Sequence, residues 1–275
     1  MLMNWLKNKK VRIKANAPEL KKTLVVLSSL VSKNIKNQYR RSVLGIIWTV
    51  LGPLLNMLVL SFVFSYFFGR GNIGMDYPVY ILSGNIVFNL MRMATGNSLT
   101  CIVDNYELLT KTRIQYSVFP ISQNLSSAVN FGFSMLALII VMLVRLSRGV
   151  GFYWTMLLTI VPWLPSVLLF SVGVSFILCA IYVRFRDIKH IYSIFLTLWM
   201  YMTPIFYSFS ILPENVQKVI MFNPMYHYTK YFRNALVGIV PDLQAHLICY
   251  GVGIGFFLIG SLIFRLTRKK FILYM

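Results

Sequence analysis

The side chains able to carry acid, base or ion chemistry are few, and they lie outside the long apolar stretches of the sequence. The seven carboxylates fall at the edges of these stretches or between them: Glu19, Asp76, Asp104, Glu107, Asp187, Glu214 and Asp242. Transporters driven by protons or sodium ions commonly hold a carboxylate inside the bilayer as the ion site. The three histidines, at positions 190, 227 and 246, are scattered and form no cluster with the acids. These observations argue against ion coupling and against a hydrolase or transferase embedded in the membrane.

Nucleotide and metal chemistry have no support in the sequence either. The chain has no Gly-x-x-x-x-Gly-Lys-Ser/Thr segment, and therefore no P-loop with which to bind and split ATP. Cys101, Cys179 and Cys249 are far apart, each within an apolar run, which favours buried inert thiols over a disulfide framework or a metal site. We expect no catalytic residue, no metal ion and no cofactor on this chain.

The elements that position the remaining polar residues are predicted to be membrane spans. Hydrophobic residues make up 57% of the chain, charged residues make up 12%, and the mean hydropathy is +0.69. Between Arg41 and Arg70 there are 28 residues without a charge, more than the roughly 20 that an α-helix needs to cross a bilayer. Further spans are expected at about 79–103, between Arg113 and Arg145, within 149–183 with a bend at Pro162 and Pro165, from His190 towards Pro213, and at 243–264.

The basic residues predict the orientation of these spans. The net charge is +20, but the charges fall into blocks between apolar runs, which argues against nucleic acid as a partner. Twenty Lys and Arg lie in the segments expected inside and six in those expected outside. Cytoplasmic loops of membrane proteins carry the excess of Lys and Arg, so we expect both termini in the cytoplasm.

The amino-terminal 42 residues are expected to form a cytoplasmic segment with an amphipathic helix on the membrane surface. Apolar residues from Leu20 to Val31 recur at helical spacing on one side, and lysines lie on the other. The segment either binds an anionic lipid head or only anchors the topology. The candidates for lipid-head binding are Lys33, Lys36, Arg40 and Arg41.

Two further features interrupt the apolar pattern. Arg92 lies near the middle of the second span, where a charge costs about 2.5–3.5 kcal/mol on insertion scales and is normally turned towards partner helices or a wet cavity. It either contacts cargo or is satisfied by neighbouring carbonyl groups. The segment 104–113 predicts a short cytoplasmic helix, with Asp104 and Glu107 spaced as an N-cap pair.

Aromatic residues concentrate towards the outer end of the fifth span. Trp199, Tyr201, Phe206 and Tyr207 surround Pro204, which is expected to break the helix. Such rings either line a path through the membrane or pack and anchor the span at the interface. Residues 213–241 form neither a clean span nor an ordinary loop, which predicts a re-entrant or interfacial region.

Several short motifs follow one another along the chain. After the basic amphipathic segment come Tyr39-Arg40-Arg41-Ser42-Val43-Leu44-Gly45, Trp48 and Leu51-Gly52-Pro53-Leu54, then Leu108-Leu109 and Phe119-Pro120, and finally Thr203-Pro204-Ile205-Phe206-Tyr207 with Asn223-Pro224. In this order, over six spans, they resemble the permease subunits of ABC-2 type exporters of polysaccharide, O-antigen or teichoic acid.

The resemblance implies an all-α integral membrane protein with six transmembrane helices, an amino-terminal amphipathic interfacial helix and re-entrant helices before the last span. Its parts would be a cytoplasmic segment at 1–42, a six-span domain at 43–264 and a cytoplasmic tail at 265–275. It further implies a half-transporter in the bacterial cytoplasmic membrane. This half-transporter would pair with a second copy of itself and with an ABC ATPase subunit, and ATP and magnesium would bind on the ATPase. The cargo would be an undecaprenyl-linked glycan.

The resemblance also suggests roles for particular residues. The ATPase would dock on the helix at about 104–113, through Asp104, Glu107, Leu108 and Leu109. The translocation path would include Trp199, Tyr201, Phe206, Tyr207 and Arg92. The alternatives are an ABC-2 permease for another amphipathic cargo, and a channel or assembly subunit that uses no ATP.

Overall fold

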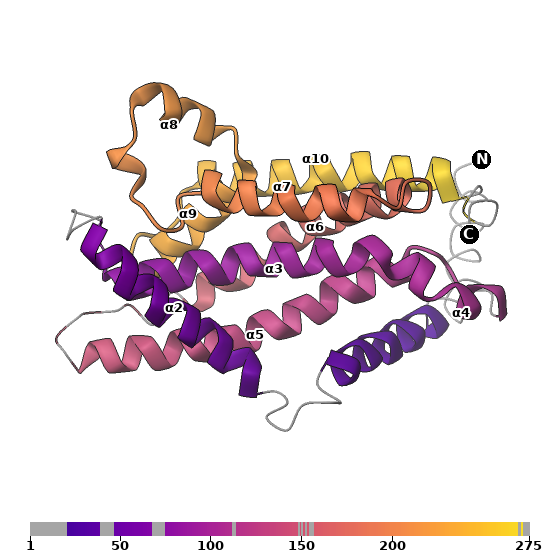
Figure 1. The fold of residues 1–275 in the computed structure, drawn as a ribbon, viewed down its shortest axis with the longest axis horizontal. Coiled ribbons are helices and arrows are strands. Elements are labelled where there is room, and N and C mark those ends of the chain that lie inside the picture. The colour runs from indigo at the N-terminus through magenta and orange to yellow at the C-terminus, as the bar shows by residue number, and fades with distance from the viewer. Residues whose placement is uncertain are drawn as a thin grey trace, which may run out of the picture.

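The computed structural model describes residues 21–38, 47–67, 75–111, 114–147, 149, 151, 153, 157–268 and 271, and within these ranges all regular structure is helical (Figure 1). An unlabelled helix at 21–38 precedes the following elements: α2 Ile47–Phe67, α3 Tyr77–Asp104, α4 Tyr106–Lys111, α5 Val118–Leu146, α6 Leu157–Tyr182, α7 Ile188–Met202, the 3-10 turn η2 Phe209–Ile211, α8 Glu214–Met221, α9 Pro224–Leu236 and α10 Leu243–Thr267. The all-α prediction is confirmed.

Four of the described helices are long and apolar enough to cross a membrane, namely α3, α5, α6 and α10. They lie side by side along the long axis of the molecule (Figure 1). Helix α2 contributes a shorter apolar stretch, Val50–Leu60, and α7 has 15 residues. The chain is therefore a multi-pass membrane protein, and the count of six spans stays a prediction.

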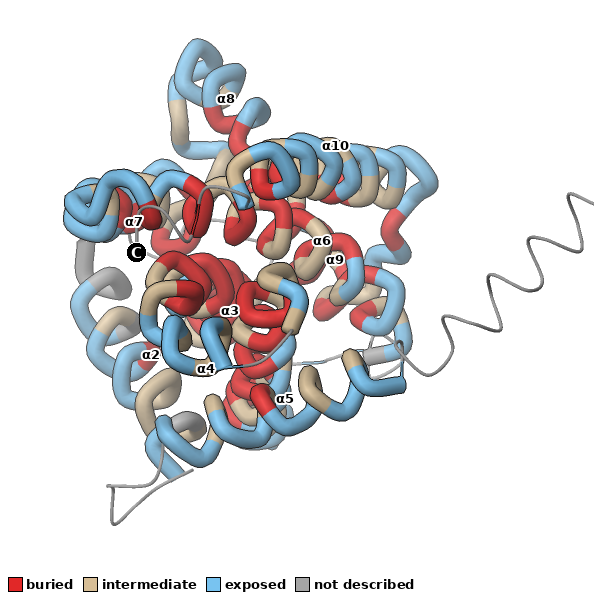
Figure 2. The backbone as a smooth tube through the Cα atoms, turned by 90° about the vertical axis from the view of Figure 1, so that its right-hand side faces the viewer, coloured by how far each residue is buried: buried red, intermediate tan, exposed pale blue. Residues whose placement is uncertain are grey.

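Helix α3 is the centre of the bundle. It contacts α2, α5, α6, α7 and α9, and Figure 2 shows its tube mostly in the colour of buried residues. The outward faces of α2, α7 and α10 are exposed and apolar, as expected for surfaces against lipid. α3 thus connects most other elements of the fold.

Helices α6 and α10 approach each other closely through glycine. A Cβ atom added at Gly260 would overlap the carbonyl oxygen of Gly173, and one added at Gly253 would lie 2.7 Å from the carbonyl oxygen of Ser166. Small residues at such contacts let two helix backbones approach closely. In a membrane, where the hydrophobic effect does not drive helices together, this close packing is a main contribution to helix association. The close backbone contact between α6 and α10 therefore requires glycine, which has no side chain, at these positions.

The polar residues near the start of α5 are used for packing. Asn124 donates to the hydroxyls of Ser98 at 3.2 Å and Ser175 at 2.9 Å, which joins α5 to α3 and α6. On the other side, Asn130 donates to Gln38 of the amino-terminal helix at 2.9 Å. The helix at 21–38 is thus held against α5 by amide and hydroxyl contacts.

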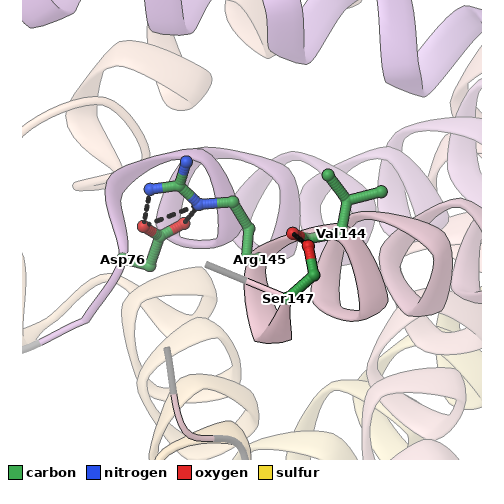
Figure 3. Close-up of polar contacts among 4 residues, drawn as sticks. All are labelled: Asp76, Val144, Arg145 and Ser147. Atoms are coloured by element: carbon green, nitrogen blue, oxygen red, sulfur yellow. Dashed lines mark hydrogen bonds and ion pairs between the residues drawn. The ribbon is translucent and has the colours of Figure 1, made fainter. Parts of the chain in front are cut away.

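At the opposite end of the bundle from α4, an ion pair joins α3 to α5. Arg145 Nε lies 2.9 and 3.0 Å from the two carboxylate oxygens of Asp76, and Nη2 contacts the same carboxylate (Figure 3). The fork geometry makes this a bidentate pair. The start of α3 and the end of α5 therefore lie at the same end of the bundle, as the predicted topology requires.

Helix α7 ends at Met202, just before Pro204, where the sequence predicts a break in the span that runs from His190 towards Pro213. Thr203 has extended backbone angles, φ −96° and ψ 128°, because a following proline disfavours the helical region. Residues 203–208 then run irregularly to η2. This break leaves a row of carbonyl groups with no helical partner.

Side chains of α3 and α9 satisfy those carbonyl groups one by one. Arg233 donates to Pro204 at 2.7 Å and to Ile205 at 3.1 Å. The Tyr77 hydroxyl donates to Phe206 at 3.0 Å, and the Tyr80 hydroxyl lies 2.7 Å from the carbonyl of Tyr207 and 3.1 Å from that of Pro204. The irregular segment is held in place by three side chains from elsewhere in the sequence.

The glycine contact predicts a selective loss of stability. Gly260→Ala should lower the free energy of unfolding by about 2 kcal/mol because the methyl group forces α6 and α10 apart. Gly255→Ala in the same helix meets nothing within 4 Å and should leave stability unchanged or slightly raised. Thermal unfolding of both variants in the same detergent measures this, and equal melting temperatures would contradict the contact.

The carbonyl contacts predict a second effect. Tyr80→Phe removes the donor to Tyr207 and should cost about 1–2 kcal/mol, since a buried carbonyl then has no partner. Tyr201→Phe is the matched control, because the Tyr201 hydroxyl has no partner among the described residues and its side chain is 56% exposed. A melting temperature for Tyr80→Phe as high as that for Tyr201→Phe would show that this hydroxyl is not needed.

Candidate functional site

The predicted coupling helix is present as α4, at one end of the molecule (Figure 1). Asp104 is the last residue of α3 and accepts a hydrogen bond from Thr100 at 2.6 Å, so its prediction as an N-cap of the short helix is wrong. Glu107 is exposed and forms an exposed pair with Lys111 at 3.5 Å. Leu108 and Leu109 are half-buried against the apolar cluster that includes Leu30. α4 thus presents an exposed surface that contains one acid and one base, and two half-buried leucines hold it against the apolar cluster.

The amino-terminal helix lies beside this end. Lys33 donates to Asn105, which stands between α3 and α4, at 3.2 Å. Lys33 and Lys36 are both exposed, and Leu30 is buried. A helix is observed at 21–38, within the segment where an amphipathic helix was predicted, and its position on the membrane surface stays a prediction. Arg40 and Arg41 lie outside the described residues.

A polar stripe runs along the side of α3 that other helices leave uncovered. Arg92 is exposed, and no hydrogen bond or ion pair joins its guanidinium to another described residue, although its backbone carbonyl accepts from Thr95 at 3.5 Å. After Leu82, the half-buried and exposed residues of α3 are spaced so that they share one face of the helix. They are Asn85, Asn89, Arg92, Met93, Gly96, Asn97, Thr100, Val103 and Asp104. We call this set, apart from Met93 and Val103, the α3 polar stripe. The alternative that carbonyls within the chain satisfy Arg92 finds no support in the described residues.

The four predicted path rings differ in their exposure. Trp199 is half-buried, donates to Asn223 Oδ1 at 2.7 Å, and packs edge-on against Phe88 and Phe170. Phe206 is buried, and the half-buried Tyr207 donates to the carbonyl of Tyr201 at 2.7 Å. Tyr201 is the most exposed of the four rings.

The predicted residues therefore form three groups instead of one site. The coupling residues lie at the α4 end, the rings lie at the far end of α7, and Arg92 lies between them on α3. Helix α3, which carries Arg92, also contacts α7, which carries two of the rings. A path along α3 would connect the three groups.

Sequence reasoning found Arg92 but missed the rest of the stripe. Positions 85, 89, 92, 96 and 100 repeat at three and four residues within an apolar stretch, which is the helical period and was available as a signal. Tyr80 and Arg233 were also missed as a pair. They lie 153 residues apart, and no local pattern links them.

Comparison with known proteins identifies the family to which the chain belongs. The ABC-2 type transporter family matches residues 25–237 of the chain. The chain is 32% identical to the O-antigen export system permease protein RfbA of Myxococcus xanthus over 90% of its length and 94% of that protein. It is 26% identical to the RfbA permease of Klebsiella pneumoniae over 95% and 98%. It is also 22% identical to the polysialic acid transport protein KpsM of Escherichia coli over 78% and 81%. The chain belongs to the ABC-2 type transporter family.

Proposed function

We propose that this chain is the membrane subunit of an ATP-driven exporter that moves a lipid-linked polysaccharide, such as an O-antigen or a capsule-like glycan, out across the bacterial cytoplasmic membrane. The single observation that carries the proposal is the match, over nearly the whole length of both chains, to permeases named for O-antigen export. The match to a polysialic acid transport protein supports a polysaccharide cargo in the wider sense. Teichoic acid remains a further possible cargo of the same kind.

The motor is proposed to be a separate ABC ATPase subunit that carries ATP and magnesium. The absence of a P-loop in the sequence and of a carboxylate at mid-depth of the predicted spans leaves this chain without an energy source of its own. Helix α4 supports the contact because it is an exposed surface at one end of α3, with Glu107 outward and Leu108 and Leu109 held against the core. This end would face the cytoplasm, together with both chain termini.

The path is proposed to run along the α3 polar stripe between two copies of the chain. A mid-membrane Arg and three Asn side chains facing lipid would be costly, so this face requires either water, cargo or a protein partner. Apolar exposed residues on α2 and α7, two helices that contact α3, include Leu58 and Leu198 and suit contact with a second copy. Tyr201 is the predicted ring best placed to meet cargo, because its side chain is exposed.

The basic face of the amino-terminal helix is proposed to attract the diphosphate head of the lipid carrier. Lys33 and Lys36 are exposed beside α4, and each such charge near an anionic surface contributes about 1 kcal/mol. Arg40 and Arg41 follow in the sequence just before α2 and would add to the same field. Topology anchoring alone is the competing explanation for these residues.

The first experiment tests the motor contact. When this chain is co-expressed with a candidate ABC ATPase from the same organism, the two should co-purify, and Glu107→Lys combined with Leu108→Ala should reduce the recovered ATPase at least fivefold. Glu214→Lys is the matched control, because Glu214 is an exposed acid on α8 at the opposite end. Equal recovery with both variants would exclude α4 as the docking surface.

The second experiment tests the path. Arg92→Leu should lower the amount of surface glycan at least tenfold at matched expression, because the stripe loses its only cation. Arg92→Lys keeps the charge and should retain export within about threefold. The complex and its basal ATP hydrolysis should persist in both. Normal export by the Arg92→Leu variant would show that Arg92 does not contact the cargo.

A further inference from the structure

A cavity of about 640 Å³ lies at the end of the bundle opposite α4. Its walls come from α9, η2, the first turn of α3 and the segment after α7, so it is next to the irregular segment described above. One wall is a stacked aromatic pair, Phe209 and Tyr226, with ring centroids 4.8 Å apart and an angle of 26° between the rings. Apolar residues such as Met75 and Ile239 also line the cavity, and its uncharged polar lining residues include Ser208, Ser210, Thr229 and Asn234.

The lining carries two positive charges and no carboxylate. Arg233 and Lys230 both line the cavity, and neither Asp nor Glu does. Lys230 Nζ lies 5.9 Å from the centroid of the Tyr226 ring. Asp76, which adjoins the lining residue Met75, is engaged by Arg145. Arg233 forms no ion pair with any described residue, although it is 9% exposed, and a buried charge without a counter-ion is costly.

Hydrogen-bonding groups also remain unused at this cavity. Two atoms of Arg233 donate to backbone carbonyls, but its Nε has no partner among the described residues. The hydroxyl of Thr229, which is 1% exposed, has none either. Both side chains are buried and line the same cavity. Buried groups of this kind normally have a hydrogen-bond partner, so two orphans in one cavity indicate a ligand.

We propose that this cavity is a binding site for an acidic sugar unit of the exported glycan, a residue that bears a carboxylate or a phosphate. The anion lies against Arg233 Nε, Thr229 and Lys230, where it accepts charge-assisted hydrogen bonds and balances the buried guanidinium. The C–H face of the sugar ring lies against Phe209 or Tyr226, and the serine hydroxyls bond to its hydroxyl groups. This inference rests on the proposed function for the source of the sugar. The chemistry of the site, cations without acids beside aromatic rings, is that of an anionic saccharide.

The test uses the whole chain in nanodiscs of phosphatidylcholine, without nucleotide or ATPase. Fluorescently labelled hexagalacturonate is the acidic probe, and labelled maltohexaose is the neutral probe of equal length. Hexagalacturonate should bind at least tenfold more tightly than maltohexaose. Lys230→Gln should weaken hexagalacturonate binding at least fivefold and Thr229→Val about threefold. Lys218→Gln is the matched control on α8, since Lys218 is exposed and does not line the cavity.

Three results would overturn the proposal. Equal binding of the two hexasaccharides would exclude recognition of the anion. Equal effects of Lys230→Gln and Lys218→Gln would indicate attraction by surface charge instead of a site. Loss of hexagalacturonate binding in phosphatidylglycerol nanodiscs would assign the cavity to a lipid headgroup. Each result is independent of the proposed function, because ATPase recovery and export are measured in separate assays, and a chain that fails to export can still bind the probe here.

Discussion

The architecture depends on one constraint: buried peptide carbonyls need hydrogen-bond donors, and the helix that would supply them is broken at Pro204. Non-helical backbone is tolerated in a membrane only where protein or water satisfies it. Here Tyr77 and Tyr80 of α3 and Arg233 of α9 supply the donors. Gly84 makes this possible, because a Cβ atom there would lie 2.5 Å from Arg233 Nη2. The break, the buried guanidinium and the cavity beside it are therefore parts of one arrangement.

The same helix that holds the break also reaches the proposed motor contact. α3 has 28 residues, or about 42 Å of helix at 1.5 Å per residue, and runs from Asp76 at one end to Asn105 and α4 at the other. Its buried sides pack mainly against α5 and α6 and also contact α2, α7 and α9, and the α3 polar stripe lies on its less buried face. A displacement of α4 would therefore act on a rigid element whose other end holds the irregular segment. This geometry supports coupling between an ATPase at one end and cargo contacts along and beyond α3.

The sequence predicted the class of the fold and the place of most helices, because long uncharged stretches and blocks of basic residues are strong local signals. It also predicted the break of the fifth span at Pro204, and α7 ends just before that residue, at Met202. The segment 104–113 was located, but Asp104 closes α3 instead of capping α4. Arg92 was recognised as unusual. The set of carbonyl contacts from Tyr80 and Arg233 was not predictable, because their meeting depends on how α3 and α9 pack.

Transport by the reconstituted complex tests the central claim most directly. Proteoliposomes that contain this chain, a candidate ABC ATPase and a lipid-linked glycan from the same organism would be given ATP, and the glycan that becomes accessible to a lectin on the far side would be measured. We predict accessibility that rises only when ATP, the ATPase and this chain are all present. Equal accessibility without ATP, or without the ATPase, would contradict the claim and identify the chain as a passive channel or an assembly subunit.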